Sequence, residues 1–196
     1  MKQAVIDNLP DSLKKKCCTL KKASKDETND SFMTESQIKV INFDKVPNEF
    51  SRGKGWHGVP KSNDALYISE NDKWIFIEFK NGRIDIADIY RKIYDSILMS
   101  IQMKFIKDYE FVRNNVHYIL VYNSAKYGKN EKSESLSKIN DYTLRRAKTE
   151  KKLFDVKNFE GYLLKETHTY SAEEFEEKFV KIIEDEERQE KENCIS

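Results

Sequence analysis

Two acidic residues and a lysine stand in segments that otherwise have the composition of buried strands. Glu78 and Lys80 end the run KWIFIEFK, and Asp64 begins the run DALYIS a short turn earlier in the chain. Side chains in a strand alternate between its two faces, so Glu78 and Lys80 point the same way, about 6 to 7 Å apart. If the two runs pair as a hairpin, Asp64 lies opposite the end of the second strand and all three groups meet.

Such a trio suits the metal-assisted hydrolysis of a phosphodiester bond. Two carboxylates a few ångströms apart repel each other, and a hard divalent ion relieves that repulsion while it leaves coordination positions for water and a phosphate oxygen. A neighbouring lysine can orient the attacking water, help to deprotonate it or neutralise charge in the transition state. We therefore expect Asp64, Glu78 and Lys80 to be catalytic, with Asp64 and Glu78 binding Mg²⁺ or Mn²⁺.

The neighbouring segments predict how these residues are positioned. After the turn at Asn81 and Gly82, apolar residues recur at three- and four-residue steps, which predicts an amphipathic helix over residues 85–107. The run VHYILVYN, residues 116–123, is continuously apolar and typical of a strand that is covered on both faces. Residues 38–46 favour a strand but leave a helix open, and residues 161–170 predict a last strand.

The ends of the chain differ in charge from its middle. Residues 1–31 are polar and rich in lysine, and residues 171–196 are rich in acids. We expect a basic N-terminal segment over 1–31 with no core of its own, one globular domain over 32–170 and an acidic helix over 171–196. This helix begins with a capping box, Ser171 with Glu174, and could bind a protein partner or a second copy of the chain. Its apolar stripe is Phe175, Phe179, Ile182 and Ile183.

The composition of the whole chain limits the function classes. With 196 residues, of which 38% are hydrophobic, the chain can build one core. Its 35 basic and 34 acidic residues nearly cancel, so no overall field favours nucleic acid or membrane. No run approaches the about 20 apolar residues that span a bilayer. Three cysteines without metal or disulfide spacing indicate a reduced, cytoplasmic protein.

Taken together, these segments resemble the PD-(D/E)XK nuclease superfamily, over about residues 35–123. Asp64 matches the aspartate of the second core strand of that family, and Glu78-Phe79-Lys80 matches the (D/E)XK motif of the third. Asn63 stands where the motif has proline. The resemblance implies an α/β fold of the restriction-endonuclease-like type, with a mixed central sheet flanked by helices and core elements in the order α-β-β-β-α-β.

The resemblance also implies further ligands for the ion. In the family, the carbonyl of the residue between the acid and the lysine, here Phe79, helps to bind one or two Mg²⁺ ions. Many members add a glutamate from the first helix, and of Glu35 and Glu49 we choose Glu49. An acid two residues before a lysine is common in so charged a chain, so the motif depends on its context. Because many members have lost activity, an inactive module that binds nucleic acid or a protein partner is the alternative to a nuclease.

Basic and aromatic residues in loops and helices suit a groove for a nucleic acid backbone. A solubilising surface accounts for the same residues equally well, and an exposed helix lysine is the default for residue 92. We expect DNA rather than RNA as the substrate. The candidate contacts are Lys54, Trp56, Lys61, Lys92, Arg145 and Arg146.

The three histidines are far apart in the sequence. His57 lies in a glycine-rich loop, where solvation is the default and a role as an additional metal ligand is the alternative. His117 opens a buried strand and suggests a structural role. Together with His168 they are scattered too widely to predict a zinc site.

Overall fold

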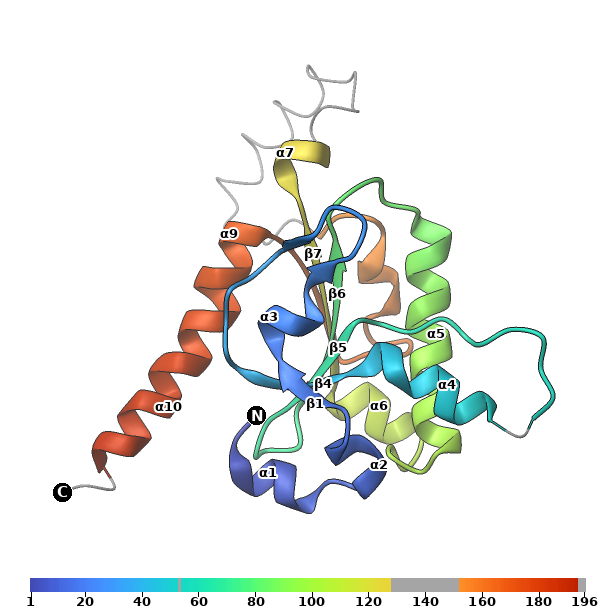
Figure 1. The fold of residues 1–196 in the computed structure, drawn as a ribbon, viewed down its shortest axis with the longest axis horizontal. Helices are drawn as coiled ribbons and strands as arrows, with labels where there is room; N and C mark the ends of the chain where they lie inside the picture. Colours follow the sequence, from blue (N-terminus) through green and yellow to red (C-terminus); the bar gives the residue numbers. More distant parts are fainter. Residues whose placement is uncertain (53, 128–151, 194–196) are drawn as a thin grey trace.

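The structure, a computed structural model, describes residues 1–52, 54–127 and 152–193 (Figure 1). It has a mixed α/β architecture in which helices flank a six-stranded sheet, as predicted. The strand order is β1-β4-β5-β6-β7-β8; β1, β4, β5 and β6 are antiparallel neighbours, and β6, β7 and β8 run parallel. The strands are β1 (Cys17–Thr19), β4 (Lys39–Asn42), β5 (Ala65–Ile68), β6 (Trp74–Lys80), β7 (Val116–Tyr122) and β8 (Glu166–Ser171).

Helix α5 (Ile86–Gln102) connects the parallel strands β6 and β7, as a crossover connection requires. Asp85 caps its N-terminus by accepting hydrogen bonds from the amides of Ala87 and Asp88. The helix ends earlier than the predicted residue 107. Lys104 adopts a left-handed φ of 60°, and the amide of Phe105 donates back to the Ser100 carbonyl at 2.8 Å, which closes the helix. Helix α6 (Tyr109–Asn115) then leads into β7.

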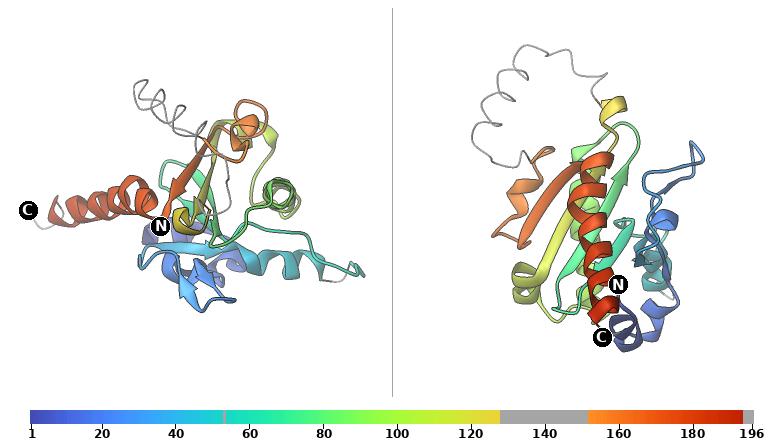
Figure 2. Two further views of the ribbon diagram at one scale, coloured as in Figure 1. Left: turned by 90° about the horizontal axis from the view of Figure 1, so that it is seen from above. Right: turned by 90° about the vertical axis from the view of Figure 1, so that its left-hand side faces the viewer.

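Helix α5 and the C-terminal helix lie on opposite faces of the central sheet (Figure 2). Alternation along β6 places Phe76, Glu78 and Lys80 on one face, which α5 covers, and Ile75, Ile77 and Phe79 on the other. The C-terminal helix covers the second face, where Phe175 packs edge-on against Phe79. Strand β7 is buried throughout except for its last residue, as its continuous apolar sequence predicts.

The C-terminal helix comprises α9 (Ala172–Phe175), a π-helical turn η3 (Glu176–Val180) and α10 (Lys181–Asn193). Its predicted capping box between Ser171 and Glu174 is confirmed. Ile183 is buried, but Ile182 is 51% exposed, so the predicted stripe is wrong at that position. Adjacent helical residues point about 100° apart, and the two isoleucines therefore cannot share one narrow face. The stripe packs on this chain's own sheet.

Residues 1–31 contribute to the core, contrary to expectation. Strand β1 extends the central sheet by pairing with β4, and Leu9, Leu13 and Leu20 are buried. A few leucines are enough because the intervening lysines can pack their methylene chains and keep their ammonium groups in water. The elements are α1 (Gln3–Asn8), α2 (Asp11–Lys14), α3 (Leu20–Ala23) and the hairpin β2 (Lys25–Asp26) with β3 (Ser31–Phe32).

The remaining elements connect these layers. They are η1 (Phe43–Lys45), α4 (Val46–Ser51), α7 (Ser124–Tyr127) and η2 (Val156–Phe159). Residues 38–46, for which a helix was an open alternative, form β4 followed by η1. Within the described ranges, no helix combines the length and the apolar character that crossing a bilayer requires.

Candidate active site

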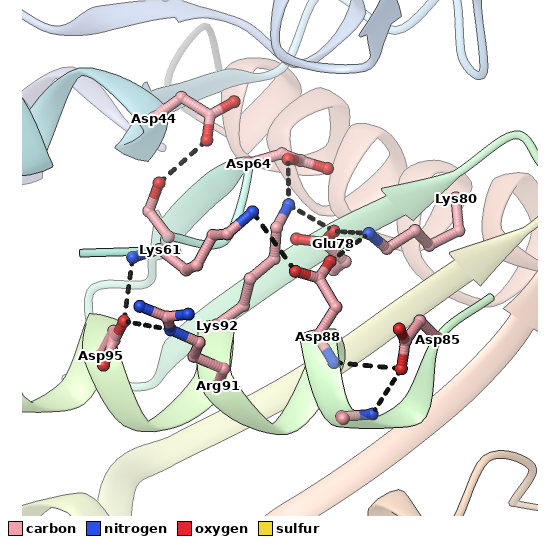
Figure 3. A network of polar contacts seen from close by, with 12 residues as sticks. Asp44, Lys61, Asp64, Glu78, Lys80, Asp85, Asp88, Arg91, Lys92 and Asp95 are labelled. Atoms are coloured by element: carbon pink, nitrogen blue, oxygen red, sulfur yellow. Dashed lines mark hydrogen bonds and ion pairs between the residues drawn. The ribbon is translucent and has the colours of Figure 1, made fainter. Parts of the chain in front are cut away.

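The hairpin of β5 and β6 brings Asp64, Glu78 and Lys80 together (Figure 3). Ala65 pairs with Ile77, so position 64 lies opposite position 78. The Asp64 Oδ2 atom accepts a hydrogen bond of 2.6 Å from the Phe79 amide, and Lys80 Nζ lies 3.1 Å from Glu78 Oε1. The register expected from the sequence therefore places two carboxylates and one ammonium at the end of β6.

Lys92 lies at the centre of this group. Its Nζ atom is 2.6 Å from Glu78 Oε1 and 3.3 Å from Asp64 Oδ1, and its side chain is only 15% exposed. The default of an exposed helix lysine is thus wrong, because α5 lies against the same face of the sheet as Glu78. Lys92 joins the two acids in the structure, whereas the sequence suggested a contact to phosphate.

A second acid on α5 extends the network. Asp88 lies one helical turn before Lys92 and therefore on the same side of the helix. Its Oδ2 atom is 3.0 Å from Lys80 Nζ, and its Oδ1 atom is 3.5 Å from Lys61 Nζ. Asp88 was missed by the sequence analysis, although its spacing of four residues from Lys92 was a usable signal.

Burial dominates the electrostatics of the two central acids. Burial, together with the charge of Glu78, raises the pKa of Asp64 well above its usual range, and Lys92 opposes that shift. Burial likewise raises the pKa of Glu78 against the opposing charges of Lys92 and Lys80. Burial alone would lower the pKa of Lys92, but the charges of Asp64 and Glu78 raise it above its usual range. Ionising both Asp64 and Glu78 is therefore unfavourable unless a cation lies beside them.

The donor set fits a hard divalent ion. The side chain of Glu78 is fully buried, and its Oε2 atom has no hydrogen-bond partner among the described residues. The hydroxyl of Tyr118 on the same face of the sheet is also buried without a partner in that part of the chain. Buried polar atoms are normally satisfied by protein, water or an ion. Carboxylate oxygens are the ligands that Mg²⁺ and Mn²⁺ prefer, so Asp64 and Glu78 can hold such an ion.

Asp44, not Glu49, is the additional acid near the pair. Glu49 on α4 forms an ion pair with Lys16 and does not line the pocket that contains Asp44 and Asp64. Asp44 in η1 accepts a 2.9 Å hydrogen bond from Ser62 Oγ, and its charge raises the pKa of Asp64 further. The resemblance implied a glutamate on a helix as the additional ligand. Asp44 lies instead in a short 3₁₀ turn after a strand, and no sequence pattern indicated an acid there.

Asp44 and Asp64 line a pocket of about 420 Å³ together with Phe79, Lys80 and the β2–β3 hairpin. Asn81 holds that hairpin in place, because its Nδ2 atom donates to Asp26 Oδ2 at 2.7 Å and to Ser31 Oγ at 3.2 Å. The N-terminal residues therefore form one wall of the candidate site.

The structure brings only some of the predicted nucleic acid contacts close to the candidate site. Lys61 reaches the network through Asp88, and Trp56 is 53% exposed beside Lys54, whose Nζ lies 5.0 Å from the indole ring centre. His57 is exposed in the same loop. Arg145 and Arg146 fall outside the described residues.

The expectation that the histidines are too scattered for a metal site is wrong in one respect. Parallel pairing of β7 with β8 brings His117 and His168 together with Glu166, and the three donor atoms lie within 4.8 Å of one another. Residues that are far apart in the sequence can still lie side by side on neighbouring strands. A histidine two residues after a glutamate in a predicted strand was the available signal.

Comparison with known proteins gives no relatives: no family model, no curated protein and no solved structure matches this chain. The chemistry of the site must therefore be inferred from its own geometry.

Proposed function

We propose that the protein is a metal-dependent nuclease that hydrolyses phosphodiester bonds, with DNA as its substrate. The observation that carries this proposal is the pair of buried carboxylates, Asp64 and Glu78, which share one cationic group. Buried acids so close together need a positive charge, and a divalent ion supplies it while also binding phosphate.

The order of elements supports the same proposal. Strands β4, β5 and β6 follow one another as antiparallel neighbours, α5 crosses over, and β7 returns parallel to β6. This β-β-β-α-β succession is the one implied by the resemblance to the PD-(D/E)XK nucleases. Within it, Asp64 immediately precedes the second strand, and Glu78 and Lys80 lie on the third, close to the arrangement that the resemblance implies.

Each residue has a role in this proposal. Asp64 and Glu78 hold Mg²⁺ or Mn²⁺, assisted by the Phe79 carbonyl as the resemblance implies, and the ion supplies Lewis-acid activation of water and phosphate. Lys80, fixed between Glu78 and Asp88, orients the attacking water and offsets the charge that develops on the phosphate. Asp44 adds negative charge beside Asp64 and strengthens attraction for the ion.

The substrate would approach across the α5 side of the sheet. Exposed Trp56 borders a pocket of about 380 Å³ with Val59, Pro60, Arg91 and Leu98. An exposed indole beside cationic side chains suits stacking on a base while the cations contact the backbone. Lys54, Lys61 and Arg91 supply these cations near the site.

One observation favours the second candidate, a catalytically inactive module that binds nucleic acid or a protein partner. Lys92 and Lys80 already place two positive charges beside the two acids from within the chain, so the fold does not need a metal ion to balance their charge. In that case the acids and lysines form a buried structural network. The two candidates differ in whether a divalent ion displaces Lys92 from the carboxylates.

A cleavage panel tests the proposal. The full chain is incubated with Mn²⁺ or Mg²⁺ and single- and double-stranded DNA and RNA. We expect cleavage of at least one substrate, and a loss of about 100-fold or more in Asp64→Asn and Lys80→Met. Glu70→Gln and Lys107→Met, both exposed, serve as charge-matched controls. Binding without cleavage under either metal would instead support the inactive module that binds nucleic acid. Neither binding nor cleavage would reject the nuclease and leave only the inactive module that binds a protein partner.

A further inference from the structure

A second group of potential metal ligands lies at the other end of the sheet. His117 is the second residue of β7, and Glu166 and His168 are in β8. His117 Nδ1 is 3.3 Å from Glu166 Oε2, and His168 Nε2 is 3.7 Å from the same oxygen. We call these three residues the His117 cluster.

The strand register explains why the three side chains face one another. His117 pairs with Glu166 and Ile119 pairs with His168, so the residues at 117, 166 and 168 share one face of the sheet. Ile75 pairs with His117, whereas Glu78 pairs with Leu120, so Glu78 belongs to the opposite face. The His117 cluster is thus separated from Asp64 and Glu78 by the sheet itself, and Ile75, which pairs with His117, lies three residues before Glu78 along β6.

His117 provides an independent sign of a missing partner. Its side chain is 6% exposed, and its buried Nδ1 atom makes no hydrogen bond within the described residues. A buried imidazole nitrogen without a hydrogen bond is unusual, because nearly all buried polar atoms have a partner. This nitrogen points toward Glu166, whose side chain is 48% exposed, so an ion from solvent can reach it.

The distances agree with tetrahedral coordination. Zinc binds nitrogen and oxygen ligands at about 2.0 to 2.2 Å, which places tetrahedral ligand atoms about 3.3 to 3.6 Å apart. The separations of 3.3 and 3.7 Å from Glu166 Oε2 fit this requirement with little movement. Two histidines and one carboxylate also match the three-ligand set of zinc sites that keep an open position.

The chemistry of the donors separates this group from the carboxylate pair. Imidazole nitrogen favours zinc and other late first-row metals, whereas oxygen-only ligands suit magnesium and manganese. We propose that His117, Glu166 and His168 form a second metal site, which binds Zn²⁺ or another late first-row metal ion and links β8 to β7.

Isothermal titration of the full, chelator-stripped chain with Zn²⁺ tests this site, with Co²⁺ absorption as a second readout of coordination. We expect a tight Zn²⁺ site, separate from any binding at Asp64 and Glu78, whose affinity is at least tenfold weaker in Glu166→Gln and His168→Gln. Glu166 is half-exposed, so its variant leaves the core intact even if changes at the buried His117 prevent folding. The Co²⁺ spectrum should show nitrogen and oxygen ligands without thiolate absorption.

Two control variants exclude other binding sites. Cys17→Ser with Cys18→Ser removes the free thiols of the described residues, and Asp64→Asn removes an acid of the other site. Both should keep the Zn²⁺ affinity of the wild type within about twofold, well inside the tenfold loss expected for a ligand variant. Unchanged affinity in Glu166→Gln and His168→Gln, or loss of binding only in the cysteine or Asp64 variants, would overturn the proposal.

Discussion

Lys92 Nζ lies 2.6 Å from Glu78 Oε1, so a lysine from α5 neutralises an acid that is fully buried on β6. The same ammonium lies 3.3 Å from Asp64, which makes it the shared counter-ion of the two acids. A divalent ion that binds both carboxylates must compete with this ammonium for their oxygens. The competition gives the nuclease proposal consequences that can be measured without a substrate.

Replacing Lys92 by Met should destabilise the metal-free protein. Removal of one partner from a buried ion pair typically costs about 3 to 5 kcal/mol, and Lys80 should reduce that cost because it still pairs with Glu78. Mn²⁺ should then raise the melting temperature of Lys92→Met more than that of the wild type, since the ion takes the place of the lost ammonium. Thermal unfolding with and without Mn²⁺ measures both effects.

The control for this comparison is Lys107→Met, at an exposed lysine 3.7 Å from Asp108, which should change stability by less than about 0.5 kcal/mol. Equal stabilisation of Lys92→Met and wild type by Mn²⁺ would show that metal and ammonium do not share a position.

Asp44 and Glu49 should differ in their effect on metal binding. Asp44 acts electrostatically on Asp64, whereas Glu49 is paired with Lys16. Asp44→Asn should weaken Mn²⁺ binding severalfold, and Glu49→Gln should leave it unchanged. Calorimetric titration of the two variants is a matched comparison, because each removes one negative charge. Weaker binding in Glu49→Gln with unchanged binding in Asp44→Asn would instead support Glu49, the residue chosen from the resemblance, as the additional ligand.

The hairpin beside the pocket should loosen in acid. Hydrogen bonds from Asn29 and Asn81 lower the pKa of Asp26 from its usual value of 3.8 to about 2. Because the pKa is lower in the folded state, Asp26 stabilises the hairpin above pH 4, and that contribution is lost as the pH falls toward 2. The protection factors of the amides over residues 25–32, which correct for the intrinsic pH dependence of exchange, should therefore fall across this range.

Asp26→Asn should flatten the pH dependence of exchange, because it removes the titrating group. Glu27→Gln, which changes an exposed acid in the same hairpin, should retain the wild-type profile. A profile that is identical in wild type and Asp26→Asn would exclude Asp26 as the origin of the effect.

The N-terminal residues should be necessary for stability. Leu13 is fully buried, and its replacement by Ala should cost about 2 to 5 kcal/mol through lost burial and the cavity left behind. Lys15→Ala nearby, at an exposed position, should have little effect. Urea unfolding of the two variants measures both changes in stability. If the N-terminal residues were a loose extension, neither substitution would change the free energy of unfolding.

The sequence predicted best where a pattern is local. The periodicity of α5, the continuous apolar run of β7 and the register that sets Asp64 opposite Glu78 all follow from the spacing of side chains. The capping box at Ser171 is likewise contained within four residues.

What the sequence did not reveal depends on contacts between distant segments. The burial of Lys92 arises from the packing of α5 on β6, and the place of β1 in the sheet depends on pairing with β4. The His117 cluster needs the register of two strands that lie about fifty residues apart, which no local spacing encodes.

The central claim is that Asp64 and Glu78 share a divalent ion. Crystals grown with Mn²⁺ and measured at its absorption edge test it most directly, because anomalous scattering locates the ion among named side chains. We predict a peak within bonding distance of both Asp64 and Glu78 carboxylates, with Lys92 Nζ moved away from them. A map without a peak at these residues, with Lys92 still bridging the two acids at high Mn²⁺ concentration, would contradict the claim.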